Sequence, residues 1–115
     1  MDESEIDAVK KENQNLMAAL TYFLGFITGI LFLLLEKNNK FVRFHAMQST
    51  ITFGGLFVLS LVVGFIPGFN AILQFIISIV AFILWIFLMF KAFSGEMYKL
   101  PYIGEIAEKQ LSKMK

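Results

Sequence analysis

The sequence of 115 residues has no cysteine and only one histidine, His45. Without cysteine, the chain can form no disulfide, no thiolate metal site and no thiol nucleophile. A single imidazole also excludes a cluster of histidine ligands. The sequence shows no nucleophile–base pair, no phosphate-binding glycine loop and no carboxylate dyad. We therefore expect no enzyme, no metal, no cofactor and no nucleic-acid partner.

Charge is scarce as well, because 17% of the residues are charged and 57% are hydrophobic, with fourteen Phe. A soluble domain of this size could not bury so much apolar surface, whereas long uncharged runs are typical of a bilayer. The runs predict spans at about 16–35, 46–66 and 71–90. The expected fold class is an all-α membrane protein with three antiparallel transmembrane helices plus a short amphipathic C-terminal helix.

Three regions follow from this pattern. Residues 1–15 form an acidic N-terminal tail, in which Ser4 with Asp7 is a candidate helix cap. Residues 16–93 form the three-helix transmembrane domain, with short connections that force antiparallel neighbours. Residues 94–115 form a cytoplasmic tail whose amphipathic helix lies on the membrane, docks on the protein or binds a partner.

Between the first two spans lies the segment Glu36 to Thr50, where only Lys37 to Asn39 need be a turn. Asn38 or Asn39 can cap the helix that follows. With three spans, this loop and the C-terminal tail share one side and carry eight of the ten basic residues. The positive-inside rule then places both in the cytoplasm and the N-terminus outside a cell membrane.

Small residues predict how the helices pack. Gly25 and Gly29 form a GxxxG pattern in the first span, and such a face lets another helix approach closely. Packing within the chain is favoured over a dimer face. The expected partner is a stripe of polar and small residues on the second span: His45, Gln48, Thr52 and Gly55.

The polar groups have two interpretations. Trp85 of the third span is placed to donate its indole N–H to Gln48 or Thr52, and such bonds fix helix register. The alternative is a polar path for protons, ions or an unfolded chain. No Asp, Glu, Lys or Arg lies inside any predicted span, so the structural interpretation is favoured and a pump is disfavoured.

His45 is expected to act as a hydrogen-bonding anchor, with a pH switch as the alternative. Glu36 is expected to lie at the same depth, with two candidate roles: pairing with Arg43 or His45, and facing the N-terminus of the helix that follows, where negative charge is favoured. The positive charges of Lys40 and Arg43 suit the N-terminus of a helix poorly, which indicates contact with lipid phosphates or with a partner.

Two segments, EKNNKFVRFHAMQS and FKAFSGEMYKLPYIGEIAEK, resemble the signatures of an uncharacterised family of small archaeal and bacterial membrane proteins. That family is grouped with the Tic-twenty-like proteins, which are components of chloroplast protein import, although the plastid members have four spans. The resemblance implies a role in moving or inserting proteins. The positions that it marks are Phe44, His45, Ala46, Gln48, Gly95, Glu96, Pro101 and Gly104.

Two functional hypotheses follow. The first is a non-enzymatic component of a membrane assembly, which binds a protein partner or further copies of itself and takes part in protein translocation or insertion. The second is a small channel or transporter formed by oligomers around His45, Gln48 and Thr52.

Overall fold

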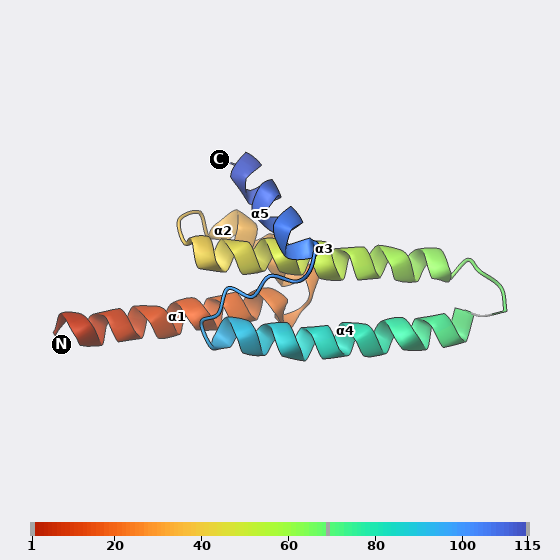
Figure 1. The fold of residues 1–115 in the computed structure, drawn as a ribbon, viewed down its shortest axis with the longest axis horizontal. Coiled ribbons are helices and arrows are strands. Elements are labelled where there is room, and N and C mark those ends of the chain that lie inside the picture. Colours follow the sequence, from red (N-terminus) through yellow and green to blue (C-terminus); the bar gives the residue numbers. More distant parts are fainter. Residues whose placement is uncertain (1, 69, 115) are drawn as a thin grey trace.

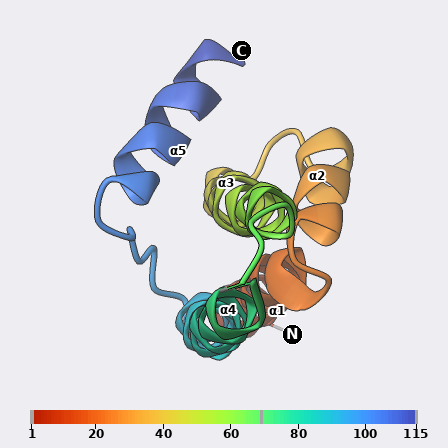
Figure 2. The same cartoon turned by 90° about the vertical axis from the view of Figure 1, so that its right-hand side faces the viewer.

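The computed structural model describes residues 2–68 and 70–114, and within these residues all regular structure is α-helical. The helices are α1 (Glu3–Phe23), α2 (Phe26–Leu35), α3 (Lys40–Val63), α4 (Asn70–Phe93) and α5 (Ile103–Lys113). Helix α3 is central: it packs against all four other helices, and the end-on view shows it between α2, α5 and the α1–α4 pair (Figure 2). Helices α1 and α3 run in one direction, and α2 and α4 run in the other (Figure 1).

The first predicted span is wrong, because the chain breaks at Leu24 and Gly25 and turns back. Gly25 has φ 63°, a conformation that only glycine adopts readily. Residues 16–23 extend about 12 Å and α2 about 15 Å at 1.5 Å per residue, so neither crosses a hydrocarbon core of ~30 Å. Among the described residues, two helices are long and apolar enough to cross a membrane, α3 and α4. The described fold is thus two spans beside a re-entrant helical hairpin, not three spans.

The break can exist at membrane depth because side chains satisfy the freed backbone groups. Trp85 Nε1 donates to the carbonyl of Phe23 at 3.1 Å, and Ser49 Oγ donates to the carbonyl of Gly25 at 2.9 Å. Thr28 Oγ1 accepts the N–H of Leu24 at 3.1 Å and donates to the carbonyl of Thr21 at 3.0 Å. Helices α3 and α4 therefore hold the turn in place.

This hairpin changes where the chain ends lie. Asn39 Nδ2 donates to Gln14 Oε1 at 2.9 Å, so the polar half of α1 lies beside the α2–α3 loop. The beginning of α1, that loop and the end of α4 are at one end of the molecule (Figure 1). The expected placement of the N-terminal tail opposite the loop, which assumed three spans, does not follow from this fold.

Helix ends follow ordinary capping chemistry. Asn39 accepts the N–H of Val42 at 3.1 Å, which confirms a predicted cap and makes Lys40 the first residue of α3. At the N-terminus, the cap is Asp2 and not Ser4, because Asp2 Oδ1 accepts the N–H of Glu5 at 2.9 Å. The acidic tail is therefore helical and continuous with α1.

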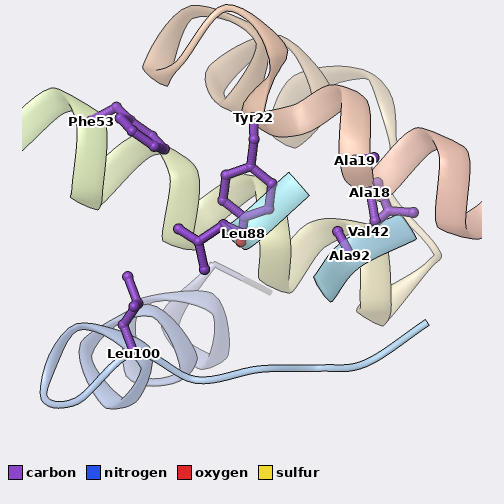
Figure 3. Packing of buried hydrophobic residues seen from close by; sticks show 8 residues of the cluster. All are labelled: Ala18, Ala19, Tyr22, Val42, Phe53, Leu88, Ala92 and Leu100. Atoms are coloured by element: carbon purple, nitrogen blue, oxygen red, sulfur yellow. The ribbon is translucent and has the colours of Figure 1, made fainter. Parts of the chain in front are cut away.

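Apolar contacts form two clusters. The larger joins α1, α3, α4 and the segment before α5, and its small residues Ala18, Ala19 and Ala92 let the helices approach closely (Figure 3). The second joins α2, α3 and α5 around Phe44 and Ala107. Outside these clusters, α4 exposes large apolar side chains such as Phe75 and Phe82. Such a surface is suited to lipid contact.

The far halves of α3 and α4 are joined by one polar pair. Ser60 Oγ donates to Gln74 Oε1 at 2.6 Å, and Gln74 Nε2 donates back to the carbonyl of Ser60 at 2.8 Å. This reciprocal pair fixes the register of the two spans. Sequence reasoning did not identify this pair.

Candidate functional site

A buried polar network connects α1, α3 and the segment after α4. Tyr22, His45 and Gln48 are each 0% exposed. Tyr22 Oη lies 2.6 Å from His45 Nδ1 and accepts a hydrogen bond from Gln48 Nε2 at 3.0 Å. His45 Nε2 lies 3.0 Å from the carbonyl of Glu96. Because a carbonyl only accepts, Nε2 carries the proton, and Nδ1 accepts the Tyr22 O–H.

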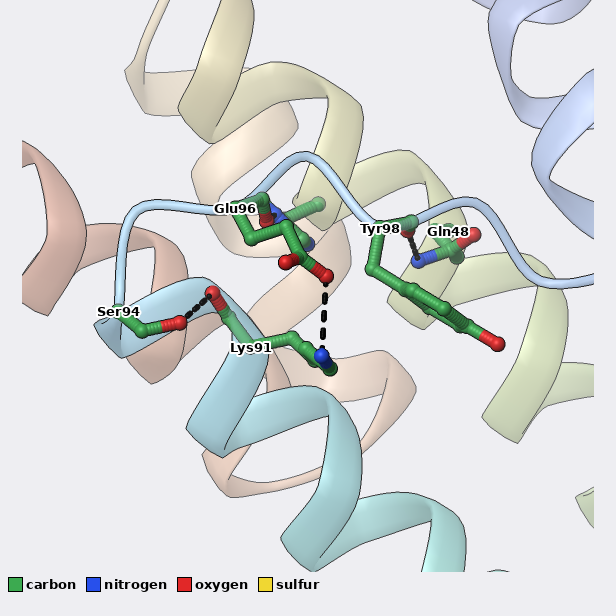
Figure 4. A network of polar contacts seen from close by, with 6 residues as sticks. Gln48, Lys91, Ser94, Glu96 and Tyr98 are labelled. Carbon is green, nitrogen blue, oxygen red and sulfur yellow. Dashed lines mark hydrogen bonds and ion pairs between the residues drawn. The ribbon is translucent and has the colours of Figure 1, made fainter.

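The network holds an extended segment, Glu96–Leu100, which we call the strap. Gln48 Nε2 donates to the carbonyl of Tyr98 at 2.9 Å (Figure 4). Gln48 Oε1 accepts the N–H of Leu100, also at 2.9 Å. Together with His45, Gln48 binds main-chain atoms at every second residue of the strap. The strap is therefore attached to α3 through its backbone.

Side chains of the strap make a second attachment, to α4. Lys91 Nζ lies 3.1 Å from a carboxylate oxygen of Glu96 (Figure 4). It also lies 5.6 Å from the centroid of the Tyr98 ring and 5.4 Å from that of Phe87. Gly95, with φ 85°, makes the turn that releases the chain from α4. These contacts are partly exposed, so they contribute less than the buried network.

Beyond the strap, α5 docks on the first half of α3. Ala107 is fully buried and packs in the cluster with Phe44 and Met47. A Cβ on Gly104 would lie 2.8 Å from Lys99 Cα, so only glycine permits this close turn. Pro101 is exposed, and its carbonyl accepts the N–H of Ile103 at 2.7 Å. Not every apolar side chain of α5 takes part in this docking, since Ile106 is 47% exposed.

Glu36 and Arg43 lie close together but form no ion pair. Arg43 Nη1 donates to the main-chain carbonyls of Glu36 at 2.7 Å and of Leu33 at 3.0 Å. The Glu36 carboxylate instead accepts the N–H groups of Asn38 and Asn39, both at 3.1 Å. The expected side-chain pairing of Glu36 with Arg43 or His45 is therefore wrong, and both residues instead stabilise the α2–α3 turn.

The remaining predicted positions have mixed placements. Thr52 is buried, and its Oγ1 is the single buried side-chain polar atom without a partner in residues 2–68 and 70–114. Trp85 donates to Phe23 and not to Gln48 or Thr52. A Cβ on Gly29 would lie 2.8 Å from the Ala46 carbonyl, whereas one on Gly55 would meet nothing within 4 Å.

Sequence reasoning missed Tyr22, the residue that joins His45 to Gln48. The signal that could have found it is its depth: Tyr22 lies well inside an apolar run, where its hydroxyl needs a buried partner. The strap was missed for another reason, because its main-chain atoms are the ones recognised and these do not depend on residue type.

The network holds the strap against α3 and has no free group for chemistry, since each hydrogen-bonding group of His45 and Gln48 is used within the chain. No group of three or more His, Cys, Asp or Glu residues able to hold a metal ion occurs among the residues described.

Comparison with known proteins relates the chain to small membrane proteins. Over 98 residues it is 54% identical to a UPF0132 membrane protein of Archaeoglobus fulgidus, covering 85% of this chain and 95% of the relative. Over 96 residues it is 55% identical to a UPF0132 membrane protein of Methanocaldococcus jannaschii, covering 84% and 86%. A second M. jannaschii protein of that name is 45% identical over 97 residues, covering 84% and 69%.

No solved structure is a significant match to the chain. Residues 13–107 match the family described as the magnetosome magnetite crystal formation protein family, a range that contains the re-entrant hairpin, the buried network and the strap. The two signature segments indicated an uncharacterised family of small membrane proteins, and these archaeal relatives support that prediction. The chain is thus a membrane protein that belongs to the magnetosome magnetite crystal formation protein family.

Proposed function

We propose that the protein is a non-enzymatic component of a membrane assembly that presents one rigid, charged surface to a protein partner. The observation that carries this proposal is the attachment of the strap to α3 by His45 and Gln48. Through it, α5 and the α2–α3 loop become parts of one surface. We call this surface the charged end; it comprises residues 36–43 and 96–113.

Charge distribution supports the orientation of this surface. All ten Lys and Arg residues lie at or before position 43 or at or after position 91. The fold brings both segments to one end, so the other end, around residues 64–70, carries no charge. By the positive-inside rule, the charged end faces the cytoplasm of the cell that holds the protein, and the N-terminal part of α1 does so too.

The resemblance to Tic-twenty-like proteins favours an assembly that moves or inserts proteins. The family description names magnetite crystal formation, which is said of the proteins that the family was named for. The oligomeric channel is the weaker candidate, since His45 and Gln48 direct their hydrogen bonds inward within one chain. A partner protein would instead meet the exposed face of α5, including Glu105 and Lys109.

The test is purification in nanodiscs from the native host, with quantitative mass spectrometry of the proteins retained. We expect one protein at fixed stoichiometry, which re-forms the complex from purified components and is lost in Glu105→Ala/Lys109→Ala. The matched control is Glu5→Ala/Lys10→Ala, which removes the same charges from the exposed face of α1 and leaves the complex intact. Ion conduction by a reconstituted homo-oligomer, abolished by Gln48→Leu, would contradict the proposal.

A further inference from the structure

A groove lies between the first turn of α3 and helix α5. Its volume is about 580 Å³, within the ~300–1,000 Å³ typical of small-molecule sites. Three cations line one side: Lys37, Lys40 and Arg43. Four apolar side chains also line it, Phe44, Met97, Leu111 and Met114, together with the polar residues Asn38, Glu108 and Ser112.

Among the residues that the structure describes, the three cations of the groove form no ion pair with a carboxylate. Glu108 is the one acidic residue of the lining, and its carboxylate lies 2.6 Å from Lys99 Nζ. No carboxylate of the described residues forms an ion pair with Lys37, Lys40 or Arg43; the ion pairs found join Lys91 to Glu96 and Lys99 to Glu108. The groove therefore carries an excess of positive charge that an external anion can neutralise.

Arg43 is held in place without being neutralised. Its Nη1 donates to the carbonyls of Leu33 and Glu36, which fixes the guanidinium at the wall of the groove. Lys40 and Arg43 also stand in the first turn of α3, where the helix dipole disfavours positive charge. The two positive charges thus destabilise the start of α3 by themselves, and a bound anion would offset that effect.

Apolar lining distinguishes this groove from a simple anion site. Met97 and Met114 are 41% and 48% exposed, and both line the groove. The first turn of α3 comes just before the apolar stretch of that span, so the groove lies where headgroups meet the hydrocarbon. An occupant with a phosphate and the beginning of an acyl chain matches both walls.

We propose that this groove binds one anionic phospholipid, with its phosphate against Lys37, Lys40 and Arg43 and its chain against the methionines. A bound lipid of this kind would join α5 to the α2–α3 turn. The site is separate from the protein-binding face of α5, because Glu105 and Lys109 are not part of its lining.

Native mass spectrometry tests the proposal on the full chain, released from vesicles of equal phosphatidylcholine and phosphatidylglycerol. We expect preferential retention of one phosphatidylglycerol. Because each lysine near an anionic surface contributes ~1 kcal/mol, Lys37→Gln/Lys40→Gln should reduce that retention by roughly tenfold or more. The control Lys10→Gln/Lys11→Gln removes the same charge from the exposed side of α1, outside the groove, and should stay within about twofold of the unchanged protein.

A second measurement reports on the groove itself. Ser112 lines it, and the chain has no cysteine, so Ser112→Cys gives one reactive thiol. Phosphatidylglycerol should slow maleimide labelling at position 112 but not in Ser94→Cys, which lies outside the lining. Equal retention by both double variants would overturn the proposal. So would protection by inorganic phosphate alone, or protection that requires an acidic partner protein.

Discussion

Gln48 and Leu100 are 52 positions apart in the sequence, and the amide oxygen of Gln48 accepts the N–H of Leu100 at 2.9 Å. The same side chain donates to the carbonyl of Tyr98 and to Tyr22 Oη. One amide thus joins α1, α3 and the strap. Removing it leaves the carbonyl of Tyr98 and the N–H of Leu100 without this partner, while Tyr22 keeps its hydrogen bond to His45.

Gln48→Leu should therefore release the strap. We expect a loss of about 2–3 kcal/mol in the free energy of unfolding, since an unsatisfied buried group costs ~1–3 kcal/mol and water reaches part of the strap. Trypsin should also cut after Lys99 faster. Unfolding in detergent and timed proteolysis measure both effects. Gln110→Leu, on the exposed face of α5, is the control; an equal effect there would contradict the role of Gln48.

The re-entrant hairpin predicts that both chain ends are labelled from one side. In vesicles, thiols in Ser4→Cys and Ser112→Cys should react with a membrane-impermeant maleimide from the same side. Three spans would give opposite sides. Because the chain has no other thiol, each signal reports one position. Labelling of the two positions from opposite sides would show that the first apolar run crosses the bilayer.

Close packing of α2 on α3 predicts that Gly29 tolerates no side chain. A Cβ there would lie 2.7 Å from Thr50 Oγ1 and 2.8 Å from the carbonyl of Ala46. Gly29→Ala should cost about 1–3 kcal/mol of unfolding free energy, because overpacking forces the helices apart. Gly55→Ala is the matched control, with open space around its Cβ, and should change stability by less than about 0.5 kcal/mol. The same thermal unfolding assay compares them.

Acid should loosen the first turn of α1. The N–H of Glu5 and the hydroxyl of Ser4 donate to Asp2 and hold the pKa of its carboxyl below the usual range. A lowered folded pKa means that the cap is fully present above the ordinary pKa of about 4 and is lost as pH falls through the lowered value. Protection of the Glu5 amide from hydrogen exchange, relative to the unfolded rate at the same pH, should therefore fall at low pH. Asp2→Asn keeps a cap but should remove this dependence.

Much of the two spans could be predicted, and the first run could not. Uncharged length placed α3 and α4 well, and Asn39 gave the start of α3. The same criterion failed for residues 16–35, because a twenty-residue window does not register a turn. That turn depends on Ser49 and Trp85, which are far away in the sequence.

The candidate site was predicted in part for a related reason. His45 and Gln48 share one helix face, so their stripe could be read from spacing alone. Their partners lie on another helix and on an irregular segment, and neither has a periodicity that leads back to α3. Recognition of main-chain atoms also leaves no trace in residue type.

Attachment of the strap through its backbone leaves its side chains free to vary. His45 and Gln48 bind only main-chain atoms of the strap, while the side chains of Glu96, Met97 and Lys99 are exposed. Substitutions at these three positions would alter what the protein displays and would leave the backbone attachment to α3 in place, with only the ion pairs of Glu96 with Lys91 and of Lys99 with Glu108 lost. The exposed side chains of the strap can therefore change while its backbone keeps the same attachment to α3. Related chains can differ in the partner that this surface binds and still share one fold.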